Sequence, residues 1–135
     1  MSPTRSAPFT PASPPLPIIL LVEANALTRM AVAGYLRECG YQVVEADGAA
    51  EAKRLLQSGA APQLAFIDLD VSDETDGFGL AQWIRAERPD MKILLTSGVR
   101  RTARTAGDLC EQGPHIAKPY DHRDLESQIR RLLAT

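Results

Sequence analysis

Hydrophobic residues follow two alternating patterns along the chain from residue 17 onward. Short continuous apolar runs rich in β-branched residues are typical of strands that are covered on both faces. Longer segments between them place apolar residues three or four positions apart, which predicts amphipathic helices. The predicted strands are residues 18–22, 41–46, 63–68, 92–98 and 115–118. The predicted helices are residues 26–39, 48–59, 77–88, 100–113 and 121–135, and the fourth has the weakest pattern.

The apolar stripes of four helices predict which side chains face the core. Gly40 and Pro89 mark the ends of the first and third helices, and Asp121 is expected to cap the start of the last one. The residues expected to face inward are Ala31, Val32, Tyr35, Leu36, Cys39, Ala52, Leu55, Leu56, Leu80, Ala81, Ile84, Leu125, Ile129, Leu132 and Leu133.

Strands that alternate with helices predict one α/β domain with a parallel sheet and helices on both faces. The crossover connections should be right-handed, and the working site of such a fold lies beyond the carboxyl ends of the strands. The first 16 residues differ, because they hold five of the ten prolines and too little apolar surface to bury. We therefore expect a disordered proline-rich tail at residues 1–16 and one folded domain at residues 17–135.

Composition narrows the classes of function. The chain has 15 basic and 17 acidic residues and a net charge of −2, so we expect no binding to nucleic acid. Its longest early apolar run is too short for a signal peptide or a membrane span, so we expect no membrane association. Cys39 and Cys110 match no metal-ligand spacing and are expected to be reduced core thiols of a cytoplasmic protein.

Polar residues stand at the ends of four predicted strands: Glu23, Asp68, Thr96 and Lys118. Because the carboxyl ends of parallel strands meet at one edge of the sheet, we expect these side chains to converge. Such a set suits phosphoryl transfer to a carboxylate, with Asp68 as the nucleophile that forms an aspartyl phosphate. Glu23 and Asp68 offer oxygen ligands for Mg²⁺. Lys118 offers a positive charge and Thr96 a hydroxyl donor for the phosphoryl oxygens.

The third strand leads into an unusually acidic loop. Its carboxylates are Asp68, Asp70, Asp73, Glu74 and Asp76. We assign Asp68 and Asp70 to the site and expect Asp73, Glu74 and Asp76 to solvate the loop and start the next helix, where negative charge is favourable. A calcium-binding loop is excluded, because its sixth position would be Asp73 instead of glycine and its twelfth Gly79 instead of glutamate.

Five motifs, taken in order, resemble the receiver domain of bacterial two-component response regulators. They are "LLVEAN", "FIDLD", "DGFGLAQWIR", "LLTSG" and "AKPY", and the resemblance covers about residues 17–134. It implies a flavodoxin-like (βα)₅ fold with strand order 2-1-3-4-5. It also implies that Asp68 accepts a phosphoryl group from a histidine kinase or phosphotransfer protein, and that the bond between Lys118 and Pro119 is cis.

The chain departs from the family pattern at several positions. Ala24 stands where the family has a second acidic Mg²⁺ ligand, so binding of Mg²⁺ by Glu23, Asp68 and Asp70 should be weak. Asn25 could lend an amide oxygen, but this oxygen is neutral, and Asp70 could compensate. The resemblance also implies that the backbone carbonyl of Asp70, two residues after the acceptor, binds the metal. The acidic loop is one residue longer than its commonest form and lacks the usual proline.

Position 115 departs as well. His115 replaces the aromatic residue that normally switches together with Thr96, and its charge could respond to pH near neutrality. An exposed surface histidine is the alternative interpretation.

The resemblance also implies how a signal leaves the domain. The chain stops after the predicted fifth helix, so we expect a stand-alone domain that acts on a downstream protein target. The family's usual surface carries Arg100, Arg101, Arg104, His115 and Tyr120 here. An ordinary solvated face is the alternative for the arginines, and Tyr120 could instead pack against the last helix. A weak homodimer could form through the same face.

Parts of the sequence also fit two other functions. "FIDLDVS" also resembles the first motif of haloacid-dehalogenase-type phosphatases, but that family needs an acidic pair on a strand after the lysine, and its nucleophile usually ends the first strand. The second of these functions is that of a pseudo-receiver adaptor, a protein-binding module whose pocket no longer binds metal well because of Ala24. We expect the chain not to be an enzyme.

Overall fold

Five parallel strands form a sheet in the computed structural model, which describes residues 16–73, 75–98 and 113–135. In chain order the strands are β2 (Ile18–Val22), β3 (Gln42–Ala46), β4 (Leu64–Asp68), β5 (Lys92–Ser97) and β6 (His115–Ala117). Their order in the sheet is β3-β2-β4-β5-β6. Counted from the first strand this order is 2-1-3-4-5, so the predicted flavodoxin-like, doubly wound fold is confirmed.

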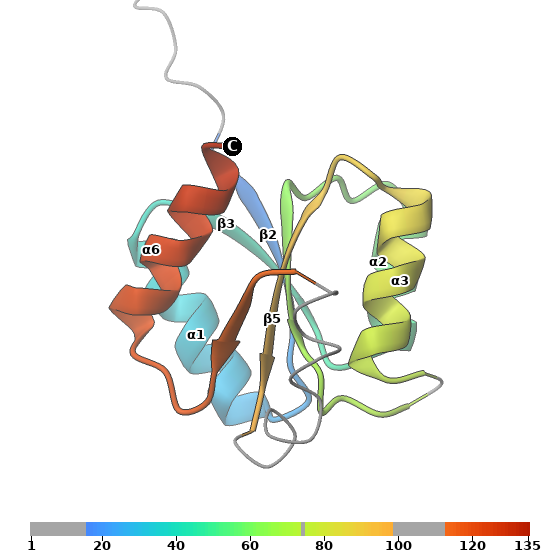
Figure 1. The fold of residues 1–135 in the computed structure, drawn as a ribbon, viewed down its shortest axis with the longest axis horizontal. Coiled ribbons are helices and arrows are strands. Elements are labelled where there is room, and N and C mark those ends of the chain that lie inside the picture. Colours follow the sequence, from blue (N-terminus) through green and yellow to red (C-terminus); the bar gives the residue numbers. More distant parts are fainter. Residues whose placement is uncertain (1–15, 74, 99–112) are drawn as a thin grey trace, which may run out of the picture.

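Helices cover both faces of this sheet (Figure 1). α1 (Ala26–Glu38) and α6 (His122–Leu133) lie on one face, and α2 (Ala49–Gln57) and α3 (Gly77–Glu87) lie on the other. The predicted helix at residues 100–113 falls almost entirely outside the described residues. In the part of the chain that the structure describes, no helix has both the length and the apolar character that a membrane crossing requires.

β4 is buried along its whole length, and its side chains alternate between the two layers of helices. Ala65 and Ile67 pack with residues of α2 and α3. Leu64 and Phe66 pack with residues of α1 and α6. Full burial of a large apolar side chain stabilises a fold by about 1.5–3 kcal/mol, so β4 is anchored from both sides and holds Asp68 in a defined place at its end.

The expected inward stripe of α1 is wrong at two positions. Val32, Ala33 and Leu36 are the buried residues of this helix, and Ala31 is exposed. The buried stripe of α1 is rotated from the expected one, because Ala33 packs against the sheet and Ala31 does not. Cys39 is also exposed, because it is the C-cap residue beyond the last helical turn, although its thiol is free as expected. Cys110 lies outside the described residues.

Local capping explains where the helices begin and end. Asp121 accepts a hydrogen bond from the backbone N–H of Arg123, which confirms it as the N-cap of α6. α1 ends before Gly40, whose φ of 102° is readily adopted by glycine. The chain then reverses, and the N–H of Tyr41 donates to the carbonyl oxygen of Leu36.

Candidate functional site

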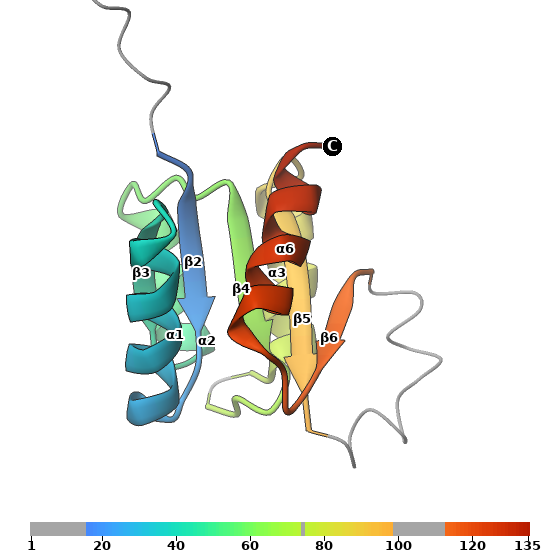
Figure 2. The ribbon, with the colours of Figure 1, turned by 90° about the vertical axis from the view of Figure 1, so that its left-hand side faces the viewer.

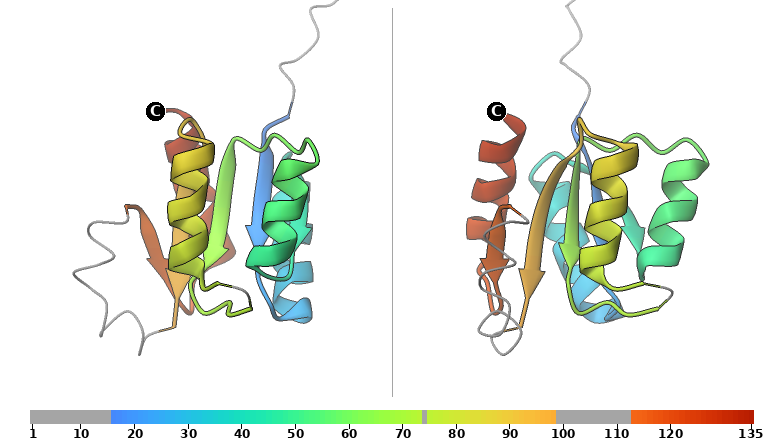
Figure 3. Two further views of the ribbon diagram at one scale, coloured as in Figure 1. Left: turned by 90° about the vertical axis from the view of Figure 1, so that its right-hand side faces the viewer. Right: turned by 45° about the vertical axis from the view of Figure 1, so that its right-hand side comes forward.

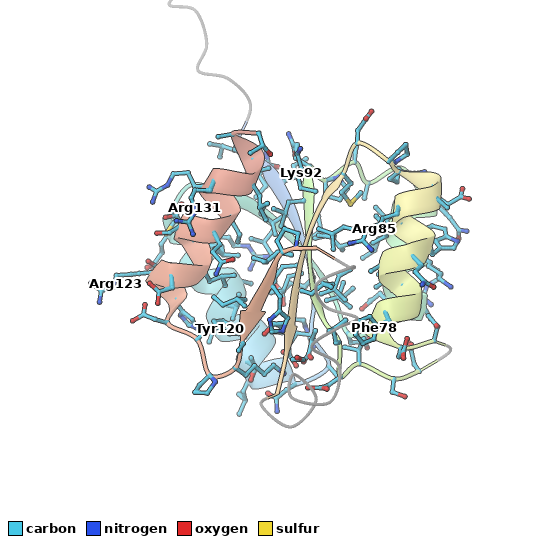
Figure 4. All side chains as sticks on the ribbon, in the orientation of Figure 1. Phe78, Arg85, Lys92, Tyr120, Arg123 and Arg131 are labelled. Atoms are coloured by element: carbon cyan, nitrogen blue, oxygen red, sulfur yellow. The ribbon has the colours of Figure 1, made fainter. Side chains whose placement is uncertain are left out.

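The carboxyl ends of the strands meet at one edge of the sheet, which is the lower edge in Figures 1 and 2. The register pairs Asp68 of β4 directly with Thr96 of β5. It also pairs Val22 of β2 with Ile67 of β4, so Glu23 follows beside Asp68. Figure 4 shows Phe78, at the start of α3, near the same edge, whereas Lys92, at the start of β5, lies at the opposite one.

Asp68 and Lys118 form the centre of the site. The Asp68 side chain is only 5% exposed, and its Oδ2 accepts a hydrogen bond of 2.7 Å from the Lys118 ammonium. Its Oδ1 accepts a second bond, of 2.8 Å, from the backbone N–H of Asp70. A charge-assisted bond of this kind is short and strong. The two bonds therefore fix the plane of the carboxylate.

The charges around Lys118 keep it protonated. Its burial lowers the pKa of the amine, but the hydrogen bond to Asp68 and the charges of Asp68, Glu23 and Asp70 together raise that pKa above its ordinary value. The ammonium is therefore a permanent positive charge beside the buried carboxylate at neutral pH.

Glu23 lies in a less favourable environment. Its side chain is buried, and its Oε2 accepts a hydrogen bond of 2.9 Å from the backbone N–H of Asn25. Burial raises the pKa of this carboxyl; the bond from Asn25 opposes the effect, and the neighbouring charge of Asp68 adds to it. Two carboxylates thus face each other with too little positive charge to balance them.

The oxygens at this edge are of the kind that bind Mg²⁺. Such ions keep several waters and need only one or two protein carboxylates, and Glu23 and Asp68 supply two. The Asp70 carboxylate is already engaged at the rim of the site, because its Oδ2 accepts from the Gly98 N–H at 3.1 Å and lies 3.7 Å from the Lys118 ammonium. Among the described residues, no three His, Cys, Asp or Glu side chains form a metal centre. The donor set therefore fits Mg²⁺ through two carboxylates, with any third protein oxygen coming from the backbone.

Asn25 is occupied by the start of α1. Its side-chain oxygen accepts a hydrogen bond of 2.9 Å from the Thr28 N–H and so caps the helix. If this oxygen were to bind a metal, α1 would therefore lose its N-cap hydrogen bond. Ala24, between Glu23 and Asn25, is exposed and offers no side-chain oxygen.

Thr96 carries a buried hydroxyl that lacks a partner. The residue is 1% exposed, and its Oγ1 has no hydrogen-bond partner among the described residues. A buried hydroxyl without a partner costs free energy. An acceptor that arrives beside Asp68, such as a phosphoryl oxygen, would remove this cost.

His115 is half-buried, which contradicts the alternative of an exposed surface histidine. Its Nε2 lies 3.1 Å from the Ser97 hydroxyl, within hydrogen-bonding distance. Burial lowers the pKa of the imidazole, so its neutral form is favoured.

The expected output surface is only partly described. Arg100, Arg101 and Arg104 lie outside the described residues. Tyr120, labelled in Figure 4, packs edge-on against Phe66 with ring centroids 5.7 Å apart, so its ring belongs to the core between the sheet and the α1–α6 layer. The Lys118–Pro119 bond is cis, as expected.

The acidic loop holds one residue whose role the sequence did not indicate. Asp73 does not simply solvate the loop, because its two carboxylate oxygens accept from the N–H groups of Ala49 and Ala50 at the start of α2, each at 3.2 Å. Asp76 caps α3 through the Gly79 N–H, as expected for a residue that starts this helix. Glu74 lies outside the described residues.

Fold and site together define a doubly wound α/β domain in which a buried aspartate pairs with a lysine at the strand ends. The chain belongs to the family of response regulator receiver domains, whose sequence profile matches residues 19–130. The Brucella abortus response regulator receiver protein CpdR is 31% identical over 116 residues, which cover 85% of this chain and 95% of that protein.

Longer proteins match as well. The Pseudomonas aeruginosa transcriptional regulatory protein GltR is 31% identical over 118 residues, and the match covers 85% of this chain but 48% of GltR. The chain thus spans about half the length of this relative. Among solved structures, a response regulator receiver protein from Pseudomonas putida has a TM-score of 0.78 at 32% identity, over 88% of this chain and 99% of that one.

Proposed function

We propose that Asp68 accepts a phosphoryl group from a histidine kinase or phosphotransfer protein, and that the chain then signals to a downstream protein through protein contacts. The observation that carries the proposal is the pair of buried Asp68 and Lys118 at 2.7 Å, beside the Thr96 hydroxyl, which has no partner among the described residues. The pair supplies a fixed nucleophile and a fixed positive charge, and the hydroxyl supplies a donor that is still available.

The proposed reaction exchanges one bond to phosphorus for another. A carboxylate oxygen of Asp68 attacks the phosphorus, and the bond from phosphorus to the donor's imidazole nitrogen breaks. The bonding electrons stay on the imidazole, and the product is an acyl phosphate on Asp68. Lys118 stabilises the charge on the phosphoryl oxygens, and Thr96 donates a hydrogen bond to one of them.

We propose that Glu23, Asp68 and the backbone carbonyl of Asp70 hold Mg²⁺. The bound ion would offset the negative charge of the two carboxylates and of the incoming phosphoryl group. We also propose that the ion binds weakly, since Ala24 contributes no charge. This weakness is what favours a pseudo-receiver adaptor as the second candidate.

The surface beside the site supports a protein as the phosphoryl donor. An open cavity of about 710 Å³ adjoins Glu23 and Lys118 and continues along α1 to Thr28. Nearby on α1, Leu27 is 79% exposed and Met30 is 62% exposed. Large apolar side chains at this level of exposure favour contact with a partner.

Further parts of the proposal concern location and output. The free thiol of Cys39 suits a reducing compartment, so we propose a cytoplasmic location. We propose that the downstream protein contacts the face of β6 and α6, and that this face could also support a weak homodimer. The net charge of −2 supports a protein target over nucleic acid.

Intact mass spectrometry tests the proposal. Incubation with acetyl phosphate and Mg²⁺ should add the mass of one phosphoryl group to the wild type and to the control Asp90→Asn, whose side chain is exposed and lies before β5. Asp68→Asn should gain nothing. If neither acetyl phosphate nor a panel of histidine kinases modifies the wild type, the pseudo-receiver adaptor is favoured.

We further propose that the chain is not an enzyme. Incubation with a generic phosphomonoester should then release no more than one molecule of phosphate per molecule of protein. Multiple turnovers that Asp68→Asn abolishes would instead support the phosphatase that "FIDLDVS" resembles.

A further inference from the structure

The N-terminus of α2 is capped from a distant part of the chain. Its own N-cap residue, Gly48, has no side chain to offer. Instead, the Asp73 Oδ1 accepts from the Ala49 N–H and Oδ2 accepts from the Ala50 N–H, each at 3.2 Å. A carboxylate at this position satisfies two free N–H groups and lies at the positive end of the helix dipole.

Gly48 leaves space for this contact. A Cβ at residue 48 would lie 2.5 Å from Oδ2 of Asp73, which is too close for any stable contact. The φ of Gly48 is −178°, an extended conformation that every residue adopts, so the glycine is needed for space and not for its backbone freedom. Gly48 and Asp73 therefore act as a matched pair.

Asp73 belongs to the loop that also carries Asp70. Leu69 and Val71 of this loop are buried in the same core cluster as Ala49, whereas Asp70 between them reaches the site. In Figure 3 the loop from β4 to α3 runs along the lower edge of the sheet toward α2. The loop is thus held by β4 at one end and by the cap on α2 further along.

We propose that Asp73 is a positioning residue, which anchors the loop on α2 and thereby keeps the backbone of Asp70 in place at the proposed Mg²⁺ and phosphoryl site. This inference rests on the proposed function of Asp68. Asp73 itself touches neither the nucleophile nor the phosphoryl group, and its effect passes through Asp70, whose N–H donates to Asp68 at 2.8 Å.

Two different substitutions should break the contact. Asp73→Ala removes the carboxylate together with its charge, and Gly48→Ala displaces the carboxylate while its charge is kept. Both should raise the Mg²⁺ concentration that gives half of the maximal rate of phosphorylation by acetyl phosphate, by about tenfold. The rate at saturating Mg²⁺ should change less than about twofold, since the Asp68–Lys118 pair is intact.

The double variant sharpens the test. Once Asp73 is alanine, a Cβ at residue 48 no longer meets a carboxylate, so Gly48→Ala added to Asp73→Ala should have no further effect. Asp121→Ala is the matched control, because it removes the N-cap of α6 without touching the loop. It should leave the Mg²⁺ dependence unchanged.

Amide hydrogen exchange tests the inference without phosphorylation. Exchange of the Asp70 N–H should accelerate about tenfold or more in Asp73→Ala and in Gly48→Ala, and not in Asp121→Ala. Unchanged exchange at Asp70 in folded Asp73→Ala would overturn the positioning role. If the wild type is not phosphorylated but its Asp70 amide responds as expected, the proposed function fails and the positioning of the loop stands.

Discussion

At the scale of single residues, the carboxylates around Asp68 outnumber the described cations that pair with them. Among the described residues of this group, the three carboxylates of Glu23, Asp68 and Asp70 share one ammonium, that of Lys118. Burial makes the imbalance more costly for Glu23 than for exposed Asp70, because a buried carboxylate has lost its hydration. A divalent cation is the partner that such a group favours.

An acidic residue at position 24 should strengthen the binding of Mg²⁺. Ala24→Asp should lower the Mg²⁺ concentration at half-saturation by about tenfold, because a charged ligand is added beside Glu23. Isothermal titration calorimetry with Mg²⁺ measures the change. Ala86→Asp, on the exposed side of α3, is the control for added charge and should bind as the wild type does. Equal affinities in all three proteins would show that residue 24 does not reach the metal.

His115 should make the stability depend on pH. Its pKa is lowered by burial in the folded protein, so below about pH 6.5 the unfolded chain binds this proton more readily than the folded one. The free energy of unfolding should therefore fall as the pH drops through this range. His115→Gln has no proton to take up and should lose less stability.

Urea unfolding at about pH 7.5 and about pH 5.5 measures this difference between the two proteins. Glutamine can still form a hydrogen bond with Ser97, so the comparison isolates the titration. If both proteins lose the same stability between the two pH values, the titration of His115 does not contribute.

At the scale of elements, α6 shows how one helix is held against the sheet. Asp121 caps its start, and Leu125 and Ile129 are its buried residues. Glu126, one position after Leu125, accepts a hydrogen bond of 2.7 Å from the hydroxyl of Tyr41, the residue just before β3. Burial, followed by this bond, raises the pKa of Tyr41, so the phenol stays neutral and remains a donor at physiological pH.

Truncation of a buried side chain in α6 should be costly. Leu125→Ala should lower the free energy of unfolding by about 2–5 kcal/mol, because it removes apolar contacts and leaves a cavity. Arg131→Ala, on the exposed side of the same helix, should change it by less than about 0.5 kcal/mol. Chemical denaturation measures both. A loss below about 1 kcal/mol at Leu125 would mean that α6 is not packed as described.

For the whole molecule, hydrogen bonds of residues 16–18 tie the start of β2 to the rest of the sheet. The carbonyl oxygens of Leu16 and Pro17 accept from the Gln42 side chain and backbone, respectively, and the Ile18 N–H donates to the Gln63 side chain. These bonds join the start of β2 to both of its neighbours in the sheet.

Removal of residues 1–15 should leave the domain intact. The free energy of unfolding should stay within about 0.5 kcal/mol of that of the full chain, because the bonds at residues 16–18 remain. A further deletion through Ile18 is the comparison that should destabilise the domain, since it removes the first rung of β2. A large loss from the first deletion alone would contradict the expected proline-rich tail.

Much of this architecture could be predicted because it depends on local periodicity. The apolar runs and helical stripes depend on neighbouring residues, so the nine described elements lie close to their expected ranges. The residues at the strand ends, such as Asp68, Thr96 and Lys118, follow from the same reasoning, since any parallel sheet brings strand ends together.

Other features depend on contacts between distant segments. The register that places Glu23 beside Asp68 is a property of paired strands. Asp73 finds its partners 23 and 24 positions earlier in the chain, where Gly48 leaves the space. No pattern within a single segment contains that information.

The sequence by itself determined the elements, their parallel arrangement and the polar groups at the strand ends, because each follows from side chains close together along the chain. Only the tertiary structure decided which carboxylate pairs with Lys118, which hydroxyl is left without a partner, and which acid caps α2. Those outcomes depend on distances between residues that only the folded sheet brings into contact.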